Sequence, residues 1–571
     1  MNWENYSIKL KELGYAEKDI SDIKPAFEFA KETHKNEKRL SGEPYFLHPV
    51  AVSLYVAKLK LDSGAVKAAL LHDVIENQKI KIEKIKKEFG EETAFLVEAL
   101  TKADTVKYKG IEREVESLRK MFLSFAKDIR VVIIKLMDRL HNMETLNFQK
   151  KEKQNRIATE TLELYAPLAD RLGMWELKAR LEDLAFPYIH KEEFFWVQEQ
   201  IKDKRKNGEE FLEKLKPELE HELKKENIIP QKITYRTKHL YSIWKKLLKY
   251  EMDFNRILDI VAMRIVVNSV ADCYQTLGII HKLWKPMPGR IKDFIALPKP
   301  NGYQSLHTTV FGPEKKIVDF QIRTNQMDKE AEFGIAAHWS YEEQGKKFAT
   351  QKGGGKKFEW ISQLQEWYND HKNSTKKDAL NALKIDFFKD RIFVLTPKGD
   401  VIDLPEGATP IDFAYHIHSE VGNHMLGAKV NGKMVSFNHI LKSGENVEIL
   451  TQKNKEPTMD WLENTKSSLA KNRIRAFLRN NGKLKQIEKK QKMIEISITV
   501  EDRVGLLKEC SEVFANLKIN LLELKTDFKN KSYPKIIFYF AEKNNINMGK
   551  IKIMLKKIKG VQNVAAQSYL K

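Results

Sequence analysis

Residues 257–267 read ILDIVAMRIVV, and this stretch decides how the middle of the chain folds. Its β-branched residues form a short apolar run of the kind that fills a buried strand. Three further runs follow and are broken by Pro and Gly: IIHKLWKP (279–286), LHTTVFG (306–312) and KIVDFQIRT (316–324). With the preceding KITYRTKHLYSIWKKL (232–247), the pattern predicts a mixed sheet flanked by helices.

The flanking sequence predicts a different structure on each side of this sheet. From Ser7 to about Gln200, apolar residues recur at spacings of three and four, which is typical of a helical bundle. On the C-terminal side, QGKKFATQKGGGKK (344–357) has the composition of a linker, and strand-like runs from about Asp390 to Gln452 predict a small β-rich unit. The last segment has the order strand, helix, strand, strand, helix, strand, which predicts a ferredoxin-like unit of about 75 residues.

The expected fold class is therefore multidomain α+β. The expected domains are a helical domain with connecting helices (1–200), a mixed-sheet domain (201–343), a linker (344–388), the β-rich unit (389–452), a short helical segment with a Lys-rich linker (453–492) and the ferredoxin-like unit (493–571).

Composition narrows the class of protein. The 571 residues include 100 Lys and Arg against 79 Asp and Glu, a formal net charge of +21. This excess favours polyanionic partners such as RNA or nucleotide phosphates, although a Lys-rich composition gives the same excess without a partner. No apolar run reaches the roughly 18 residues of a spanning helix, and the first residues lack the apolar core of a secretory signal, so we expect a cytoplasmic protein with no membrane partner. The two cysteines, Cys273 and Cys510, are too far apart for a clustered metal or disulfide motif.

A first group of chemically active residues lies in the helical half. It comprises His48 in SGEPYFLHP, His72 and Asp73 in ALLHDVIEN, and Asp138 in KLMDRLHN. Two imidazoles and two carboxylates suit a divalent cation such as Mn²⁺ or Fe²⁺. Apolar neighbours predict that the HD pair lies within a buried helix, with Glu76 one turn beyond it and able to orient or deprotonate a metal-bound water. This pattern indicates a metal-dependent phosphohydrolase; a solvated pair on a helix surface is the alternative.

A second group lies between Tyr235 and His338. Its cations are Arg236, Lys238, Lys246, Arg290 and Lys292. Five cations can neutralise a triphosphate and its acceptor, which is most of what phosphoryl transfer requires. Asp259 and Asp319 stand at strand-like positions, where they could bind Mg²⁺ and accept a hydroxyl proton; ordinary strand-end acids are the alternative. The chain has no Walker-type motif and no HRD…DFG set, which argues against P-loop enzymes and protein kinases.

Eight ordered segments resemble one family over nearly the whole chain. They are SGEPYFLHP, ALLHDVIEN, KLMDRLHNMETL, YAPLADRLGMWELK, DIVAMRIVV, LWKPMPGRIKDFIALPKPNGYQSLHTTVFGP, QIRT and EFGIAAHW. The family is the long RelA/SpoT homologues, the bifunctional alarmone synthetase-hydrolases of the stringent response. The resemblance implies that the first domain is an HD-type hydrolase that removes the 3′-pyrophosphate from (p)ppGpp. Mn²⁺ would be held at His48, His72, Asp73 and Asp138, Glu76 would act in catalysis, and Arg39 and Asn142 would contact the nucleotide.

The same resemblance implies that the second domain is a GTP pyrophosphokinase. It would transfer pyrophosphate from ATP to the 3′-hydroxyl of GDP or GTP, with release of AMP. Asp259 would bind Mg²⁺ and Asp319 would be the acid near the 3′-hydroxyl. The ATP phosphates would meet Arg236, Lys238, Ser242 and Lys246, and the guanine nucleotide would meet Arg290, Lys292, Lys299, Asn301, His307 and Tyr303, the last as a platform under the base. RIKD (290–293) matches the basic form of the bifunctional members.

The C-terminal units resemble the regulatory modules of the same family. The β-rich unit resembles a TGS domain, in which His416 and His418 could contact RNA, although helix-surface histidines are more often only solvated. The last unit resembles an ACT domain through VEDRVGLLKE and its strand order. Uncharged tRNA and the ribosome are the partners that this implies.

Three features depart from the family pattern. Asn77 stands where the family has a second acid after the HD pair, and Asp319 stands where it has Glu. The longer helical domain and the Cys-rich zinc-finger domain between TGS and ACT are missing, so we expect weakened ribosome regulation. The rival interpretation is a non-catalytic RNA- or ribosome-binding regulator that has kept the architecture. The sequence leaves open the strength of the hydrolase, the preference for GDP or GTP, the ACT ligand and the oligomeric state.

Overall fold

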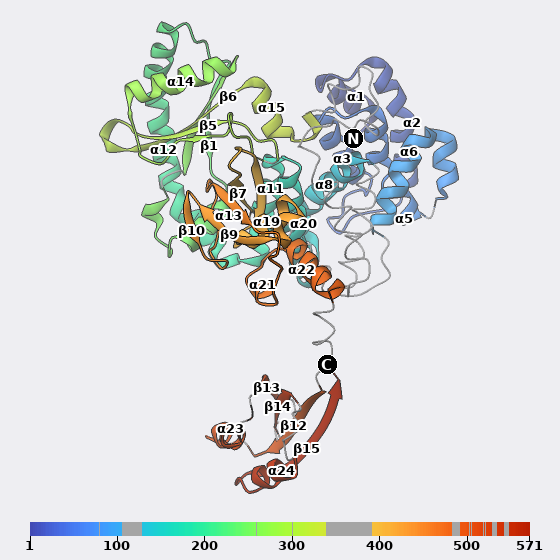
Figure 1. Ribbon diagram of the computed structural model, residues 1–571. Helices are drawn as coiled ribbons and strands as arrows, with labels where there is room; N and C mark the ends of the chain where they lie inside the picture. The colour runs from blue at the N-terminus through green and yellow to red at the C-terminus, as the bar shows by residue number, and fades with distance from the viewer. Residues whose placement is uncertain are drawn as a thin grey trace. The chain divides into compact units, whose positions relative to one another are not determined.

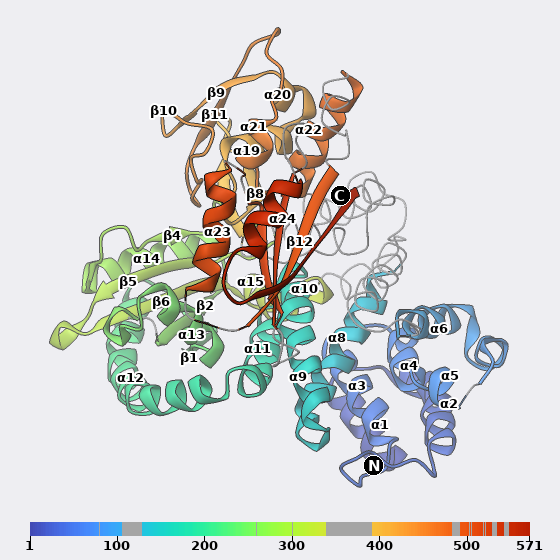
Figure 2. The same cartoon turned by 90° about the horizontal axis from the view of Figure 1, so that it is seen from below.

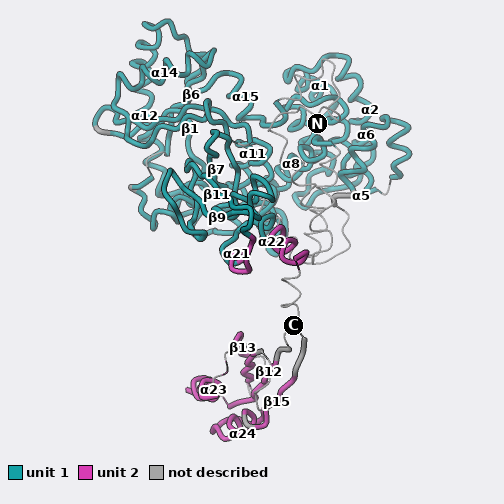
Figure 3. The backbone as a smooth tube through the Cα atoms, in the orientation of Figure 1, with its two compact units in different colours: residues 1–455, 463–471 teal, residues 456–462, 472–571 magenta. Residues whose placement is uncertain are grey.

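The computed structural model describes residues 1–78, 80–104, 128–257, 260–299, 301–337 and 391–481, and toward the C-terminus residues 492–501, 503, 505–517, 519, 521–527, 534–541 and 548–570. The chain divides into two compact units, one of residues 1–455 and 463–471 and one of residues 456–462 and 472–571 (Figure 3). The linker expected at 344–388 lies outside the described residues. None of the described helices is both long enough and apolar enough to cross a membrane.

The N-terminal part is a bundle of helices, as the spacing of apolar residues predicts (Figure 1). Its helices are α1 (Trp3–Glu12), α2 (Glu17–Thr33), α3 (Leu47–Lys58), α4 (Ser63–Leu71), α5 (Val74–Gln78), α6 (Ile82–Asp104) and α8 (Ile129–Glu144). Asp62 and Asp128 fix the starts of α4 and α8, because their carboxylates accept hydrogen bonds from the first main-chain N–H groups. Helices α3, α4 and α8 contact one another around buried residues such as Val56, Leu70 and Ile134.

A second set of helices connects this bundle to the sheet. It consists of η1 (Leu146–Phe148), α9 (Lys151–Glu160), a π-helical turn η2 (Thr161–Tyr165), α10 (Ala166–Arg171), α11 (Trp175–Ile189) and α12 (Lys191–Lys225). The long helix α12 buries Leu212, Leu219 and Leu223 and contacts strands β1 and β2 of the sheet described next (Figure 2).

The predicted mixed sheet is confirmed. Its elements are β1 (Lys232–Thr237), α13 (Leu240–Lys249), η3 (Phe254–Arg256), β2 (Val261–Val267), α14 (Val270–Leu283), β3 (Lys285–Pro286), β4 (Lys292–Asp293), β5 (Leu306–Phe311), η4 (Pro313–Lys315), β6 (Ile317–Thr324) and α15 (Asn325–Phe333). The strand order is β1-β2-β6-β5-β3, with β4 beside β5; β2 and β6 run parallel, and the other neighbours are antiparallel.

Alternation along the strands divides the sheet into an apolar and a polar face. Met263, Ile265, Phe320 and Ile322 are buried in one core with residues of α12 and α14. The intervening residues of the same strands lie on the opposite face, and this is where the charged side chains of β1, β2 and β6 stand.

The β-rich unit is built from two small sheets and two short helices. Its elements are β7 (Arg391–Leu395), β8 (Val401–Pro405), α19 (Pro410–Ile417), α20 (Ser419–Asn423), β9 (Met425–Val430), β10 (Lys433–Val435) and β11 (Val447–Thr451). Asp412 has no exposed surface and accepts hydrogen bonds from the main-chain N–H groups of Thr409, Lys466 and Ser467, so it ties residues 463–471 to the start of α19.

The second unit contains a four-stranded antiparallel sheet with two helices, preceded in the chain by α21 (Asp460–Glu463) and α22 (Ser468–Asn480). Its elements are β12 (Lys492–Val500), α23 (Leu506–Asn516), β13 (Glu523–Asp527), β14 (Lys535–Ala541), α24 (Met548–Lys556) and β15 (Val561–Leu570). The order β13-β14-β12-β15 is that of a ferredoxin-like module, as the element order predicts. That it is an ACT domain stays a prediction.

Candidate active sites

The helical bundle brings the four predicted metal ligands into one cluster. His48 lies in the first turn of α3, His72 and Asp73 follow α4, and Asp138 lies within α8. One ligand atom from each of His48, His72 and Asp138 lies within 4.8 Å of the other two, and all three side chains are buried. Oδ2 of Asp73 is 3.3 Å from Nε2 of His72 and 3.7 Å from Nε2 of His48.

The HD pair does not lie within a helix, so this detail of the sequence analysis is wrong. α4 ends at Leu71 and α5 begins at Val74, with His72 and Asp73 in the turn between them. Successive residues on a helix point about 100° apart, whereas a turn lets both side chains reach one cluster. The helical spacing from His72 to Glu76 therefore does not apply, and Glu76 is exposed on α5.

Hydrogen bonds fix which imidazole nitrogens carry protons. The guanidinium of Arg39 can only donate, and it lies 3.2 Å from Nδ1 of His141, so that nitrogen accepts. Nδ1 of His48, at 2.9 Å from the same atom, must then be the donor. Nδ1 of His72 donates to the carbonyl oxygen of Ala69 at 2.8 Å. Nε2 of both ligand histidines is left to face the carboxylates, and Nε2 of His72 is buried without a hydrogen-bond partner among the described residues.

The electrostatics of this cluster fit a bound cation. Burial lowers the pKa of His48, whereas for His72 the carboxylates of Asp73 and Asp138 outweigh burial and raise the pKa to about 9. Burial opposes ionisation of the two acids, but the histidines and Lys135 hold the pKa of Asp73 and of Asp138 below the usual range. Two ionised carboxylates around two ring nitrogens favour a positive charge between them. The donor set therefore fits a divalent metal.

Further residues hold these predicted ligands in place, and several of them were not predicted from the sequence. Tyr45 donates to Asp73 at 2.6 Å, and Lys135 and Asn142 donate to Asp138 at 2.9 and 2.6 Å. Such outer bonds orient ligands and keep them ionised. His141 lies three residues after Asp138 on α8, and that spacing on one helix face was an available signal.

The two residues predicted to contact the hydrolase nucleotide lie beside this cluster. Arg39 donates to Oδ1 of Asn142 at 2.8 Å and to Oγ1 of Thr145 at 2.9 Å. Asn142 in turn contacts Asp138, so Arg39 is two hydrogen bonds from a predicted metal ligand. The helix α5 includes Asn77, whose side chain lies outside the described residues.

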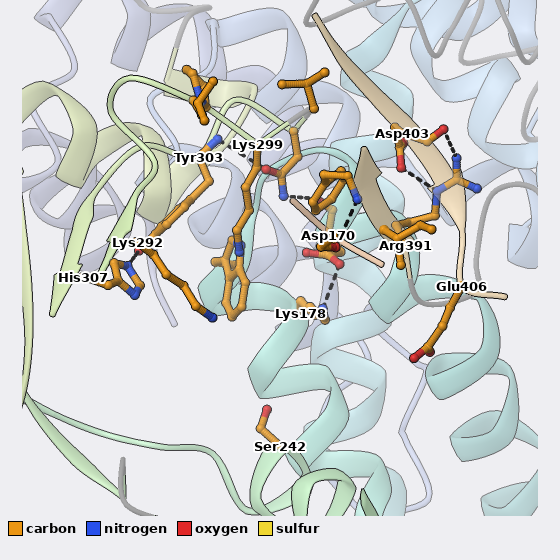
Figure 4. Close-up of a pocket in the computed structure, with 18 of the residues that line it drawn as sticks. Asp170, Lys178, Ser242, Lys292, Lys299, Tyr303, His307, Arg391, Asp403 and Glu406 are labelled. Carbon is orange, nitrogen blue, oxygen red and sulfur yellow. Dashed lines mark hydrogen bonds and ion pairs between the residues drawn. The ribbon is translucent and has the colours of Figure 1, made fainter. Parts of the chain in front are cut away.

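A second site is a cavity of about 1820 Å³ above the polar face of the sheet (Figure 4). Eleven of the predicted synthetase residues line it: Arg236, Lys238, Ser242, Lys246, Arg290, Lys292, Lys299, Asn301, Tyr303, His307 and Asp319. Asp259, the predicted Mg²⁺ ligand, lies outside the described residues.

Strand register explains why distant residues meet here. Arg236 on β1 pairs with Ala262 on β2, which pairs with Asp319 on β6, which pairs with Thr309 on β5. Residues directly opposite one another in paired strands share a face, so Arg236 and Asp319 stand in one row. Oγ1 of Thr309 donates a hydrogen bond to Oδ1 of Asp319.

The cavity has an excess of positive charge. Burial lowers the pKa of Arg236, and burial outweighs the nearby carboxylate of Asp170 to lower the pKa of Lys299 to about 8. Burial and the same cations lower the pKa of His307 to about 3, so this ring is neutral; it lies 2.8 Å from the hydroxyl of Tyr303. Depressed pKa values on several neighbouring bases indicate a site that is stabilised by an anion.

Residues outside the sheet also line this cavity, and their contribution was not predicted from the sequence. Helices α10 and α11 contribute Asp170, Trp175 and Lys178, and Nζ of Lys178 lies 2.8 Å from Oδ2 of Asp170 (Figure 4). The β-rich unit contributes Arg391 and Asp403, among others. Nothing in the local sequence of these segments signals a contact with a distant sheet.

The two histidines predicted to contact RNA differ in environment. His416 lines the cavity, where burial and the positive charges of Arg391 and Arg171 outweigh the carboxylate of Asp403 and lower its pKa to about 4. His418 is exposed, and its Nδ1 accepts a hydrogen bond from the main-chain N–H of Glu420 at the start of α20.

Comparison with known proteins identifies three family regions. Residues 26–175 match the HD domain, residues 235–346 match the region found in RelA / SpoT proteins, and residues 392–451 match the TGS domain.

Curated relatives match most of the chain. It is 42% identical over 534 residues to a guanosine-3′,5′-bis(diphosphate) 3′-pyrophosphohydrolase of Aquifex aeolicus, covering 92% of this chain and 75% of that protein. It is 45% identical over 474 residues to a GTP pyrophosphokinase of Myxococcus xanthus (82% and 62%), and 42% identical over 465 residues to the bifunctional (p)ppGpp synthase/hydrolase SpoT of Escherichia coli (81% and 66%). The chain thus spans between 62% and 75% of the length of these three relatives. With both active-site regions present in order, this protein belongs to the family of long RelA/SpoT homologues.

Proposed function

We propose that the protein is a bifunctional alarmone enzyme that makes (p)ppGpp in the cavity above the sheet and hydrolyses it at the buried His and Asp cluster. The ranges that we propose for the two activities are 201–343 and 1–200, followed by regulatory TGS (389–452) and ACT (493–571) modules. The observation that carries the synthetase is the row across three strands in which Arg236 and Asp319 share one face inside a cationic cavity.

In the synthetase, the two substrates would occupy two sets of side chains. The cations Arg236, Lys238 and Lys246, with the hydroxyl of Ser242, would bind the ATP phosphates and stabilise the charge that develops during transfer. The 3′-oxygen of GDP or GTP attacks the β-phosphorus of ATP, the bond from that phosphorus to the α-phosphate oxygen breaks, and AMP leaves. Asp319 accepts the hydroxyl proton, and the Thr309 hydroxyl holds this carboxylate in place.

Guanine-nucleotide binding would use the loop that precedes β5. Tyr303 would lie under the base. Its hydroxyl is hydrogen-bonded to Nε2 of His307, and its main-chain N–H donates to Oδ1 of Asn301. Arg290, Lys292 and Lys299 would neutralise the phosphates. Mg²⁺ would be held at Asp259 and would supply charge neutralisation of the transferred group.

The hydrolase would use the four clustered residues whose arrangement favours a bound cation. His48, His72, Asp73 and Asp138 would hold Mn²⁺, which when bound acidifies a coordinated water. Arg39 and Asn142 would bind the 3′-phosphates from beside the cluster, and Glu76 would take part in proton transfer from the exposed helix α5.

We further propose a cytoplasmic enzyme that senses translation. The TGS match and the exposed His418 support uncharged tRNA as a partner, and the ribosome would act through the TGS and ACT modules. The lack of a zinc-finger region between these modules supports a weaker response to ribosomes than in longer relatives.

A direct assay tests both activities. Purified protein is incubated with ATP and GDP or GTP in Mg²⁺, and separately with ppGpp in Mn²⁺, and the nucleotides are resolved. We expect AMP with (p)ppGpp in the first reaction, and GDP with pyrophosphate in the second. His72→Asn should lower the Mn²⁺ content of the protein and stop hydrolysis while synthesis continues. Absence of AMP with either acceptor would instead favour the non-catalytic regulator.

A further inference from the structure

Three aromatic rings surround one ammonium group inside the cavity. Nζ of Lys299 lies 4.8 Å from the ring centroid of Phe294, 5.0 Å from that of Tyr303 and 5.2 Å from that of Trp175. All three distances are within the range of cation–π attraction. Lys299 therefore occupies an aromatic cage, defined here as Trp175, Phe294 and Tyr303.

Trp175 differs from the other two rings in origin. Phe294 and Tyr303 belong to the segment around β4 and β5, whereas Trp175 is the first residue of α11, outside the RelA/SpoT match. Its ring centroid is 6.0 Å from that of Tyr303 at an interplanar angle of 42°. One wall of the cage is thus supplied by the connecting helices.

The surroundings of Trp175 are not those of a residue that only fills apolar space. Besides Lys299, the cations Lys178 and Arg236 lie 5.1 and 5.7 Å from its ring centroid. Its indole nitrogen is buried and has no hydrogen-bond partner among the described residues. A buried donor without an acceptor is costly and needs an explanation, such as a ligand that supplies the acceptor.

The dimensions of the cage decide what can occupy it. Two stacking contacts of about 3.5 Å each need parallel rings about 7 Å apart. The centroids of Trp175 and Tyr303 are 6.0 Å apart and the rings are tilted, so a base cannot stack on both rings at once. A base that stacks on this face of Tyr303 must displace the ammonium group and meet Trp175 as a side wall.

We propose that Trp175 is a specificity-determining residue of the acceptor-nucleotide site, and that guanine binding on Tyr303 releases Lys299 from the cage toward the phosphates of the same nucleotide. This inference rests on the proposed synthetase function. Base recognition and phosphate binding are then coupled, because the base takes the place of the cation that the phosphate attracts. The lowered pKa of Lys299 agrees with an ammonium group held at a cost that an anionic ligand would relieve.

A kinetic comparison tests the role of Trp175. We expect Trp175→Ala to raise the KM for GDP about tenfold, as loss of one ring contact to a base does, while the KM for ATP and the kcat change by less than about threefold. Trp175→Phe should restore most of the GDP affinity. Trp196→Ala, an exposed Trp on α12 outside the cavity, is the matched control and should change neither KM. An unchanged KM for GDP in Trp175→Ala, or a rise confined to ATP, overturns the proposal.

Chemical labelling tests the cage without using the reaction. Trace acetylation with acetic anhydride, followed by peptide mass spectrometry, gives the rate at Lys299 relative to the exposed Lys398. We expect Trp175→Ala, and GDP added to the wild type, each to change this ratio at least threefold, and an equal ratio in all samples contradicts a releasable cage. Failure of the wild type to make (p)ppGpp would contradict the proposed function itself. In that case the labelling ratio still tests whether Lys299 is held in the aromatic cage.

Discussion

At the scale of single residues, the two sites are organised around opposite charges. In the cluster of His48, His72, Asp73 and Asp138, the two ionised carboxylates face two ring nitrogens, which favours a cation. In the cavity, buried cations such as Arg236 and Lys299 have lowered pKa values, which favours an anion. A phosphate ester that is cut at a metal and a phosphate that is transferred among cations need these opposite environments.

Asp319 gives the first prediction. Asp319→Asn removes the proposed proton acceptor but keeps the shape of the side chain, so (p)ppGpp synthesis should fall about 10²- to 10⁴-fold without loss of folding. Release of AMP from ATP and GDP measures this. Thr309→Ser keeps the hydroxyl that bonds to Asp319 and is the matched control, which should stay within a few-fold of wild type. Synthesis by Asp319→Asn at the control rate would remove Asp319 from the mechanism.

Asn77 gives the second prediction. A neutral amide can donate and accept hydrogen bonds but cannot act as a base, so hydrolysis should be slow in the wild type although Mn²⁺ binds. Asn77→Asp should raise Mn²⁺-dependent ppGpp hydrolysis by about 10²-fold, the low end of acid-base contributions, and leave synthesis unchanged. Asn77→Gln keeps an amide and should give no gain. Rapid hydrolysis by the wild type, with no gain in Asn77→Asp, would mean that Asn77 is a tolerated variation.

At the scale of elements, the turn between α10 and α11 joins the connecting helices to the synthetase sheet. The main-chain N–H of Ile335 donates to the carbonyl oxygen of Leu172 at 2.9 Å, and the side chain of Asn301 donates to the carbonyl oxygen of Asp170 at 3.1 Å. Gly334 follows α15 with a φ of 58° and lies directly against this turn. The position of Trp175 in the cavity depends on these main-chain contacts.

Gly334 gives a prediction at this scale. A Cβ added at Gly334 would lie 2.7 Å from the main-chain carbon of Gly173 and 2.7 Å from the nitrogen of Met174, and main chain cannot move aside as a flexible side chain can. Gly334→Ala should therefore separate the turn from the sheet and lower synthesis at least about tenfold, with faster hydrogen exchange in α10 and α11. Gly432 has a φ of 80° with nothing within 4 Å of an added Cβ, so Gly432→Ala controls for backbone strain alone. Equal effects of the two substitutions would contradict a role for the contact.

The same elements show which parts of the fold can be predicted from the sequence and which cannot. The strand runs predict the mixed sheet because each run carries its own periodicity, and the βαββαβ order of the second unit follows for the same reason. The turn at His72 and Asp73, between α4 and α5, was not predicted, since the apolar neighbours on both sides match one continuous helix. The contribution of Trp175 to the cavity also could not be predicted, because it depends on contacts between residues more than 100 positions apart, such as Asn301 with Asp170.

At the scale of the whole molecule, the net charge of +21 is larger than the positive charge needed to bind nucleotide phosphates in the cavity. Many of the described lysines are exposed, such as Lys9, Lys60 and Lys398, where they contribute to long-range attraction of polyanions but carry no sequence information. Specificity for an RNA must then come from side chains that contact bases. Within the described TGS residues, His418 is an exposed ring whose Nδ1 already accepts a hydrogen bond, which leaves Nε2–H as the donor for a partner.

These two contributions separate in a salt titration of uncharged tRNA binding. Phosphate contacts make the affinity fall steeply with salt, with a slope set by the number of contacts, whereas loss of a stacking contact lowers the affinity by a similar factor at every salt concentration. We expect strong salt dependence for the wild type, and for His418→Asn a loss of about five- to tenfold in affinity with the slope unchanged. Asn is the substitution of choice because its side chain can still cap α20, so that the ring alone is lost. His190→Ala, at the start of α12 and outside the TGS match, should bind like the wild type. Wild-type affinity in His418→Asn, or a change in its slope, would mean that this ring does not stack on tRNA and that binding rests on surface charge alone.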